Sequence, residues 1–212
     1  METFSPIILR PYQMEIKLRV LDSWQTHISI MIQMPTGTGK TVVLASLVNE
    51  QLIIKNEKSG SRVWIVAHRR ELVQQIEETV ARYGIRKETG IVKVLSIQWL
   101  SRHWKDVKDE KPSLIVIDEA HHALAETYKE LWLRYPNAKK LGMTATPCRL
   151  NGKGFTDLFD VLVTSDSIAD FIRHGWLSAF DYVSIRPDSK EQGLIDSLQK
   201  RGADGDFQVK EM

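Results

Sequence analysis

The sequence predicts a three-layer α/β domain, with a largely parallel central sheet and helices on both faces. Short apolar runs alternate along the chain with longer helical stretches, which is the pattern of strand–helix–strand units. The runs are apolar enough to be strands buried on both faces, as in parallel sheets. Most end in glycine, hydroxyl or charged residues, and such sheets bind ligands at the carboxyl ends of their strands. The predicted strands are residues 28–34, 63–67, 91–96, 114–118, 139–143 and 182–185.

Length and composition favour an ordinary globular protein. The 212 residues suit one large domain or two small ones, and 42% hydrophobic content can form a core without disulfides. The single cysteine, Cys148, excludes an internal disulfide and fits a cytoplasmic location. We expect no signal peptide and no membrane partner, because no apolar run is long enough for either. The net charge of +2 does not by itself imply a nucleic-acid partner, and nothing implies an oligomer.

Residues 9–13 predict the start of a helix, with Pro11 in the first turn, where its missing N–H costs little. In one interpretation, Arg10 and Gln13 are ordinary surface residues. In the other, they contact a nucleotide base, because glutamine bonds adenine with both amide atoms and a guanidinium plane stacks on a base. The glycine-rich segment that follows them favours the second interpretation.

That segment, residues 34–41, has the sequence Met-Pro-Thr-Gly-Thr-Gly-Lys-Thr and lies between a predicted strand and a predicted helix. Gly37 and Gly39 permit backbone conformations that aim successive N–H groups at an anion, and the helix N-terminus adds partial positive charge. Lys40 is placed to reach β- and γ-phosphates, and the Thr41 hydroxyl to bind Mg²⁺. The first residue is methionine where the strict phosphate-loop pattern has glycine. The alternative is a plain turn between strand and helix.

A basic cluster follows the second predicted strand. Residues 68–72, His-Arg-Arg-Glu-Leu, open a helix that we expect to end before Gly84. Arg69 and Arg70 are candidates for contacts with a phosphate backbone, although a solvated helix start explains them equally well. Ser96, at the end of the third predicted strand, is a further candidate for the same role.

The fourth predicted strand ends in two carboxylates, Asp118 and Glu119. Acidic side chains at the tip of a buried strand are costly without a charge partner, and a bound Mg²⁺ provides one. Asp118 is placed to hold the metal, and Glu119 to orient and deprotonate an attacking water. A zinc site at His121 and His122 is the alternative, but adjacent histidines diverge and no cysteine lies nearby.

The fifth predicted strand leads into residues 144–146, Thr-Ala-Thr, which are either turn residues or groups that sense the γ-phosphate through the preceding acidic loop. Beyond them the chemical signals are weaker. Residues 167–174 predict a helix with a serine cap, ended by Gly175. A polar helix is expected at residues 188–200, followed by a tail.

The ordered set of motifs resembles the N-terminal RecA-like domain of superfamily 2 helicases with a DEAH box, a branch of the P-loop NTPases. The resemblance spans roughly residues 7–186, and we expect residues 187–212 to form a helix and linker toward a second motor domain. Within the superfamily the chain is similar to bacterial DNA-repair helicases and type III restriction-subunit motors. Residues 67–72, Ala-His-Arg-Arg-Glu-Leu, replace the Pro-Thr-Arg-Glu-Leu of DEAD-box RNA helicases, which favours DNA over RNA. The motifs that carry the resemblance are residues 10–13, 35–41, 67–72, 118–121 and 144–146.

The resemblance implies a role for each matching position, with ATP and Mg²⁺ as cofactors. Arg10 and Gln13 would bind adenine, Asp118 and Glu119 would serve Mg²⁺ and water activation, and His121 would couple the nucleotide state to movement. The phosphates and Mg²⁺ would be held by Thr36, Gly37, Thr38, Gly39, Lys40 and Thr41. The coupling group would also include Thr144, Ala145 and Thr146, and the nucleic-acid contacts Arg69, Arg70 and Ser96.

One departure from the family pattern limits the expected activity. Family members place ATP between two RecA-like domains, and the second domain supplies arginines worth about 10³–10⁵ in rate in related phosphoryl-transfer sites. The 212 residues contain no second-domain Gln-x-x-Gly-Arg-x-x-Arg segment. We therefore expect them to bind nucleotide, to hydrolyse it slowly and not to unwind duplexes on their own. A nucleotide-binding regulatory module without hydrolysis and a P-loop kinase are the competing interpretations.

Overall fold

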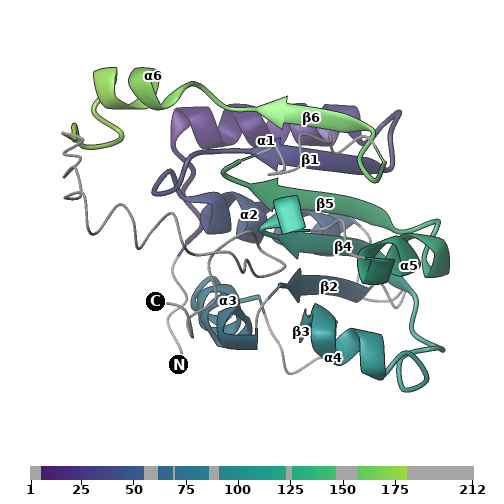
Figure 1. The fold of residues 1–212 in the computed structure, drawn as a ribbon. Coiled ribbons are helices and arrows are strands. Elements are labelled where there is room, and N and C mark those ends of the chain that lie inside the picture. The colour runs from purple at the N-terminus through teal and green to yellow at the C-terminus, as the bar shows by residue number, and fades with distance from the viewer. Residues whose placement is uncertain are drawn as a thin grey trace, which may run out of the picture. The chain divides into compact units, whose positions relative to one another are not determined.

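The computed structural model describes residues 6–54, 62–68, 70–85, 91–122, 126–146 and 157–180. Residues up to Leu177 form one compact unit. In the described part, the strands form a six-stranded sheet, all parallel, in the order β3-β2-β4-β5-β1-β6 (Figure 1). This confirms the predicted three-layer fold. The strands are β1 Ser29–Gln33, β2 Arg62–Ala67, β3 Val92–Ser96, β4 Pro112–Asp118, β5 Lys139–Thr144 and β6 Val161–Thr164.

Five of the predicted strands are present within one or two residues of their expected bounds. The sixth, at 182–185, lies outside the described residues, as does the predicted helix at 188–200. The strand that completes the sheet is β6, which the sequence analysis did not identify. It has only four residues, and a single apolar run of that length gives no periodicity that separates it from a loop.

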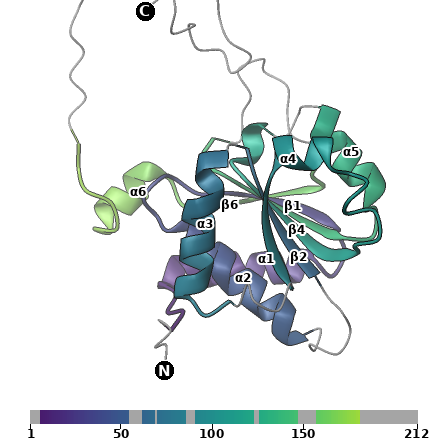
Figure 2. The same ribbon diagram turned by 90° about the horizontal axis from the view of Figure 1, so that it is seen from below.

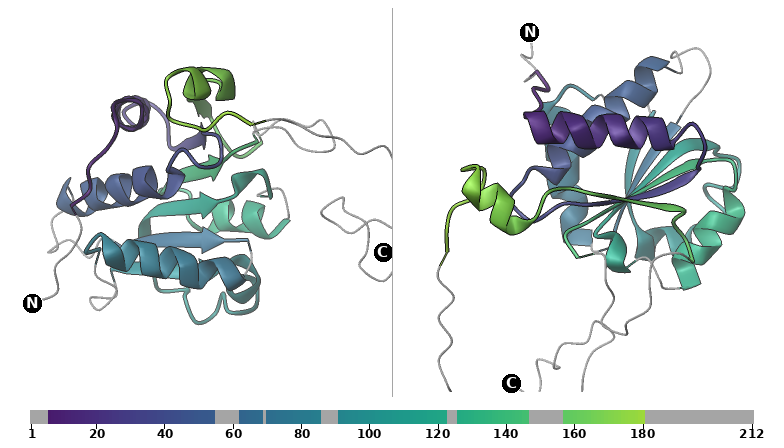
Figure 3. Two further views of the ribbon diagram at one scale, coloured as in Figure 1. Left: turned by 90° about the vertical axis from the view of Figure 1, so that its left-hand side faces the viewer. Right: turned by 90° about the horizontal axis from the view of Figure 1, so that it is seen from above.

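Helices cover both faces of the sheet (Figure 2). α1, α2 and α3 pack on one face, and α4 and α5 on the other, while α6 follows β6 beyond its carboxyl end (Figure 3). Pro11 is the first residue of α1, as predicted. In the described part of the chain, no helix is both long and apolar enough to cross a bilayer. The helices are α1 Pro11–Ser23, α2 Lys40–Ile54, α3 Arg70–Arg82, α4 Ile97–Arg102, α5 Glu126–Arg134 and α6 Ile168–Arg173, with a 3-10 turn, η2, at Ala120–His122.

The two faces of the sheet bury separate sets of side chains, because successive residues of a strand point to opposite sides. Ile30 and Ile32 of β1 pack in the core beneath α1, α2 and α3. Met31, between them, packs with Trp64 in the second core, which α4 and α5 cover. The central strands are therefore apolar at nearly every position, as the sequence predicted.

The strand order decides which loops meet. β5 lies between β1 and β4, although it is the fifth strand along the chain. Its register pairs Thr144 with Gln33 of β1, and Met143 with Asp118 of β4. The carboxyl ends of β4, β5 and β1 consequently lie side by side at one edge of the sheet.

Candidate functional site

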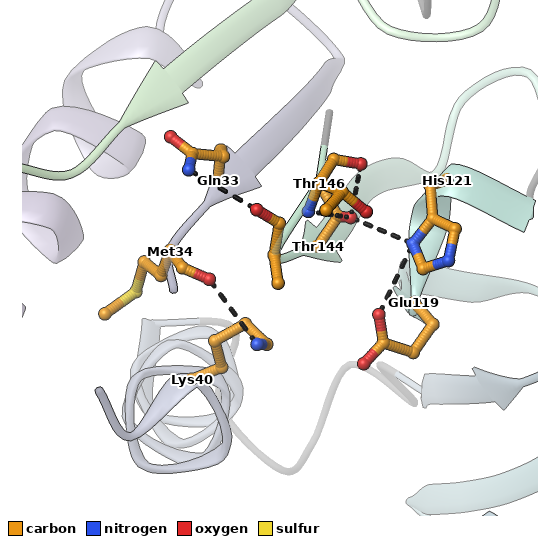
Figure 4. A network of polar contacts seen from close by, with 8 residues as sticks. Gln33, Met34, Lys40, Glu119, His121, Thr144 and Thr146 are labelled. Carbon is orange, nitrogen blue, oxygen red and sulfur yellow. Dashed lines mark hydrogen bonds and ion pairs between the residues drawn. The ribbon is translucent and has the colours of Figure 1, made fainter. Parts of the chain in front are cut away.

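Three of the predicted motifs meet at the carboxyl ends of β4, β5 and β1 (Figure 4). The backbone N–H of Met34 donates to the carbonyl of Thr144 at 3.0 Å, which extends the β1–β5 ladder into the loop. The Gln33 amide donates to the carbonyl of Ala145 at 3.4 Å. One backbone hydrogen bond thus joins the glycine-rich loop to the Thr-Ala-Thr segment, and the Gln33 side chain of β1 adds a second bond to that segment.

The glycine-rich loop has the conformation that its sequence predicted. Gly37 and Gly39 have φ angles of 85° and 80°, which other residues adopt only with strain. The Thr38 hydroxyl donates to the carbonyl of Pro35 at 2.7 Å and closes the turn. Lys40 is the first residue of α2, and its ammonium donates to the carbonyl of Met34 at 3.4 Å. The Lys40 side chain therefore lies over its own loop, where its ammonium could reach a bound phosphate.

The two threonines at the ends of the loop differ in exposure. Thr36 is exposed, whereas Thr41 is half-buried in the first turn of α2. α2 is 15 residues long, and the aligned peptide dipoles of a helix give its N-terminus a partial positive charge at this point.

The start of α1 contacts the same loop. The Tyr12 hydroxyl and the Gln13 amide both donate to the carbonyl of Thr38, each at 2.9 Å. The amide oxygen of Gln13 accepts the backbone N–H of Arg10 at 2.9 Å. A Cβ added to Gly39 would lie 2.5 Å from the Gln13 nitrogen, so the Gln13 amide would have to move from its present position. Gln13 is therefore a buried partner of the loop.

The sequence analysis missed Tyr12. It lies between two predicted site residues, and its buried ring and its bond to the loop depend on packing that sequence spacing does not show.

Asp118 and Glu119 lie at the tip of β4 and the turn that follows it. Burial raises the pKa of the Asp118 carboxyl, and the negative charge of Glu119 raises it further. A hydrogen bond from the Glu119 backbone and the positive charges of Lys40 and His121 oppose this increase only in part. A cation at this position would offset the cost, and Mg²⁺ is typically held by one or two carboxylates together with phosphate oxygens. The donor set at this tip therefore fits Mg²⁺.

Glu119 has a φ of 51°, the only positive φ of a non-glycine residue in the described part of the chain. Such a conformation costs on the order of 1–2 kcal/mol for an L-residue, and strain of this kind gathers at functional sites. It turns the chain sharply after Asp118, so that η2 begins at the next residue.

A hydrogen-bonded network joins the acidic loop to the end of β5 (Figure 4). The Thr144 hydroxyl donates to the carbonyl of Thr146 at 2.9 Å and accepts the Thr146 N–H at 3.1 Å. His121 Nδ1 lies 3.0 Å from the same hydroxyl and 3.4 Å from a Glu119 oxygen. Because the single proton of Thr144 goes to Thr146, we assign the His121 Nδ1 as a donor to Thr144. His121 thus links the acidic loop to a fully buried hydroxyl.

Two of the predicted nucleic-acid residues, Arg70 and Ser96, lie on the other half of the same edge, after β2 and at the end of β3. Ser96 pairs with Ala67 in the sheet, and its hydroxyl accepts the N–H of Trp99 at 3.2 Å as the cap of α4. Arg70 is the first residue of α3. Arg69 lies outside the described residues. The structure thus gives Ser96 a capping role, and its nucleic-acid role stays a prediction, as do those of the two arginines.

A pocket of about 760 Å³ lies at the opposite edge of the sheet, and none of the predicted site residues lines it. It is formed near the amino ends of β1 and β5, with Ser29, Trp132 and Lys140 among its lining residues. The predicted site residues in the described part of the chain therefore lie at the other edge, or in the segments next to it.

Residues 6–149 match the family model described as "Type III restriction enzyme, res subunit". The chain belongs to this family. It is 33% identical, over 155 residues, to a 51.5 kDa protein of a Lactococcus phage, covering 73% of this chain and 32% of that protein. It is 27% identical, over 205 residues, to the putative ATP-dependent helicase IRC3 of Saccharomyces cerevisiae, covering 86% of this chain and 30% of that protein.

A similar solved structure has the same fold. The UvsW helicase of bacteriophage T4 superposes with a TM-score of 0.62 at 16% identity, covering 77% of this chain and 64% of that one. Family, relatives and fold together identify the chain as an N-terminal RecA-like domain of a superfamily 2 helicase, which confirms the resemblance seen in the motifs. The chain spans about a third of the length of the curated relatives it matches.

Proposed function

We propose that this domain binds MgATP and hydrolyses it as part of a DNA helicase or translocase. One observation carries the proposal: Lys40, the Asp118–Glu119 pair and the His121–Thr144 contact come from three adjacent strand ends. A phosphate loop alone would support binding. The acidic pair next to it adds what metal-assisted attack of water on a phosphate requires.

The residues of the loop take the phosphate-binding roles. The backbone N–H groups of residues 36–41 and the α2 N-terminus face the phosphates, and Lys40 leaves the Met34 carbonyl to pair with the terminal phosphates. Thr41 and Asp118 hold Mg²⁺, which polarises the phosphate when it is bound. The raised pKa of Asp118 supports this assignment, because Lys40 and His121 offset the cost of its charge only in part in the described part of the chain.

Glu119 is the residue we assign to the attacking water. Its strained backbone turns it out of the sheet, and it is more exposed than the buried strand that precedes it. His121, Thr144, Ala145 and Thr146 then carry the change at the γ-phosphate toward the rest of the molecule. The direct contact between His121 and Thr144 supports this coupling role.

Base recognition falls to Arg10 and Gln13. Gln13 uses one N–H on the Thr38 carbonyl and one lone pair on the Arg10 N–H, so one N–H and one lone pair remain for a base edge. The same amide therefore contacts both the loop and the base. This arrangement would let the loop geometry depend on which base is bound.

Nucleic acid is assigned to the β2–β3 half of the edge, through Arg69, Arg70 and Ser96. The Ala-His-Arg-Arg-Glu-Leu segment supports DNA over RNA, and the restriction-enzyme family agrees with it. A second RecA-like domain would complete both the nucleotide site and the DNA track. For this reason we expect slow hydrolysis from the 212 residues alone.

The substitution Glu119→Gln tests hydrolysis against a purely regulatory role. In the proposed function, the variant keeps nucleotide affinity and loses about 10²–10⁴ in turnover, the usual contribution of a general base. Single-turnover hydrolysis of labelled ATP and titration with ADP measure the two quantities. Glu15→Gln, which removes an exposed acid of α1, is the control. Equal turnover by the wild type and Glu119→Gln would instead favour the regulatory module.

A further inference from the structure

The chain reverses direction at the C-terminus of α6, and the two residues that follow point back toward the glycine-rich loop. Gly175 has a φ of 71°, and its N–H donates to the Ile172 carbonyl at 3.0 Å. The N–H of Trp176 donates to the Phe171 carbonyl at 2.8 Å. These two bonds define a Schellman motif, in which a left-handed glycine reverses the chain after a helix. The next residues, Trp176 and Leu177, therefore leave the helix in a fixed direction.

Trp176 packs against the start of α1. The guanidinium of Arg10 lies 5.0 Å from the centroid of the Trp176 ring, and the Tyr12 ring lies 5.5 Å from it. Tyr12 also packs edge-on against the buried ring of Phe171, at 4.8 Å. The indole is thus held on one side, while 38% of the residue remains exposed to solvent.

Leu177 lies directly over the glycine-rich loop. A Cβ added to Gly37 would be only 3.2 Å from its terminal methyl carbon. Tyr12, which touches Trp176, also donates its hydroxyl to Thr38 of the loop. Trp176 is therefore within two contacts of the loop and in direct contact with Arg10.

We propose that Trp176 is a wall of the base-binding site and stacks on the nucleotide base that Arg10 and Gln13 receive. This inference rests on the proposed function. Flat rings stack about 3.5 Å apart, so a base between the guanidinium and the indole needs a separation of about 7 Å. At 5.0 Å the two groups are already in contact, so the guanidinium has to move off the indole by about 2 Å to admit a base between them. The indole of Trp176 is already fixed in position by its neighbours, so it offers a flat surface on which a planar ligand can stack.

The test compares ligands with and without a base. Wild type and Trp176→Ala are titrated, in Mg²⁺, with ADP and with inorganic tripolyphosphate, which engages only the loop. We expect the variant to bind ADP roughly 5- to 150-fold more weakly, the usual range for losing one base–aromatic stack, and tripolyphosphate unchanged. Trp99→Ala, on α4, is a matched control, because Trp99 is 39% exposed and lies outside the proposed nucleotide site.

Each other outcome has a defined meaning. Unchanged ADP affinity in Trp176→Ala overturns this inference and leaves the proposed function standing. An equal loss for both ligands overturns it too, because Trp176 then acts through the loop. A wild type that binds neither ligand overturns the proposed function and this inference with it.

A second measurement covers the case in which Trp176→Ala does not fold. Trp176→Phe keeps an aromatic ring, so we expect it to retain ADP binding. The change in tryptophan fluorescence that ADP causes in the wild type should be largely lost in this variant. A full fluorescence change in Trp176→Phe would show that another tryptophan reports the nucleotide, and would overturn the inference.

Discussion

Asp118 and Asp160 lie at opposite edges of the same sheet, and their pKa values shift in opposite directions. Asp160 precedes β6 at the amino edge, and one of its oxygens accepts the Ser29 N–H at 3.0 Å and the Ser29 hydroxyl at 2.8 Å. Burial alone would raise its pKa, but these bonds and one from the Ile28 N–H lower it overall. Asp118, at the carboxyl edge, has its pKa raised by burial and by Glu119.

The opposite pKa shifts of Asp118 and Asp160 indicate that the two edges of the sheet have different roles. The amino edge joins strands through satisfied polar groups. Lys140, only 2% exposed, also donates its ammonium to the Tyr135 carbonyl at 2.7 Å, although burial lowers its pKa. At the carboxyl edge, the described residues offset the charge of Asp118 only in part, and Glu119 has a strained backbone. Backbone strain and shifted pKa values often gather at functional sites, which supports our proposal that the nucleotide binds at the carboxyl edge.

The largest effect is expected at the amino edge. Asp160→Ala removes the acceptor of three hydrogen bonds and should lower the free energy of unfolding by about 1–2 kcal/mol, allowing for the exposure of the site. Urea denaturation measures this change, and ADP affinity should not move. Asp166→Asn, which alters an exposed aspartate after β6, is the control. If ADP binding were lost in a folded Asp160→Ala protein, the separation of the two edges would be wrong.

The second prediction has the opposite sign. Asp118→Asn should raise the free energy of unfolding of the nucleotide-free protein by about 0.5–1 kcal/mol, the usual gain from removing an unfavourable charge. The same variant should lose Mg²⁺-dependent ADP binding. Thermal melts with and without MgADP measure both effects, and a less stable Asp118→Asn would contradict the charge argument.

The pH dependence sharpens this second prediction. The pKa of Asp118 is raised in the folded protein, so its contribution to stability is full below the ordinary value of 3.8 and is lost as the pH rises through the folded pKa. The advantage of Asp118→Asn should therefore grow above pH 3.8. The pKa of Asp160 is lowered, so its contribution is present above 3.8 and is lost as the pH falls through the folded pKa.

The smallest effect concerns the strained residue. Glu119→Gly relieves the positive φ and should raise the free energy of unfolding by up to about 1 kcal/mol, less the entropy that glycine adds to the unfolded chain. Glu119→Gln keeps the strain and removes the charge, so the difference between the two variants isolates the backbone term. Equal stabilities, measured by urea denaturation, would show that the strain is relaxed in solution.

Much of the site was predictable because its residues are close in sequence. The glycines of the 36–41 loop are required by local backbone geometry, and their positive φ angles follow from the residue type. The acidic pair at the end of β4 follows from the contrast between an apolar run and two carboxylates. The caps of α4 and α6, Ser96 and Ser167, are equally local, although only the cap at Ser167 was predicted.

The sequence by itself determined the fold class, the glycine-rich turn and the acidic pair, since each depends on residues a few positions apart. Only the tertiary structure decided which of them meet. The insertion of β5 between β1 and β4 brings His121 to Thr144, and the reversal after α6 brings Trp176 to Arg10. Strand order and helix docking depend on packing between distant segments. A local sequence pattern does not show this packing, because the free energy of burial is gained only when the distant segments come together.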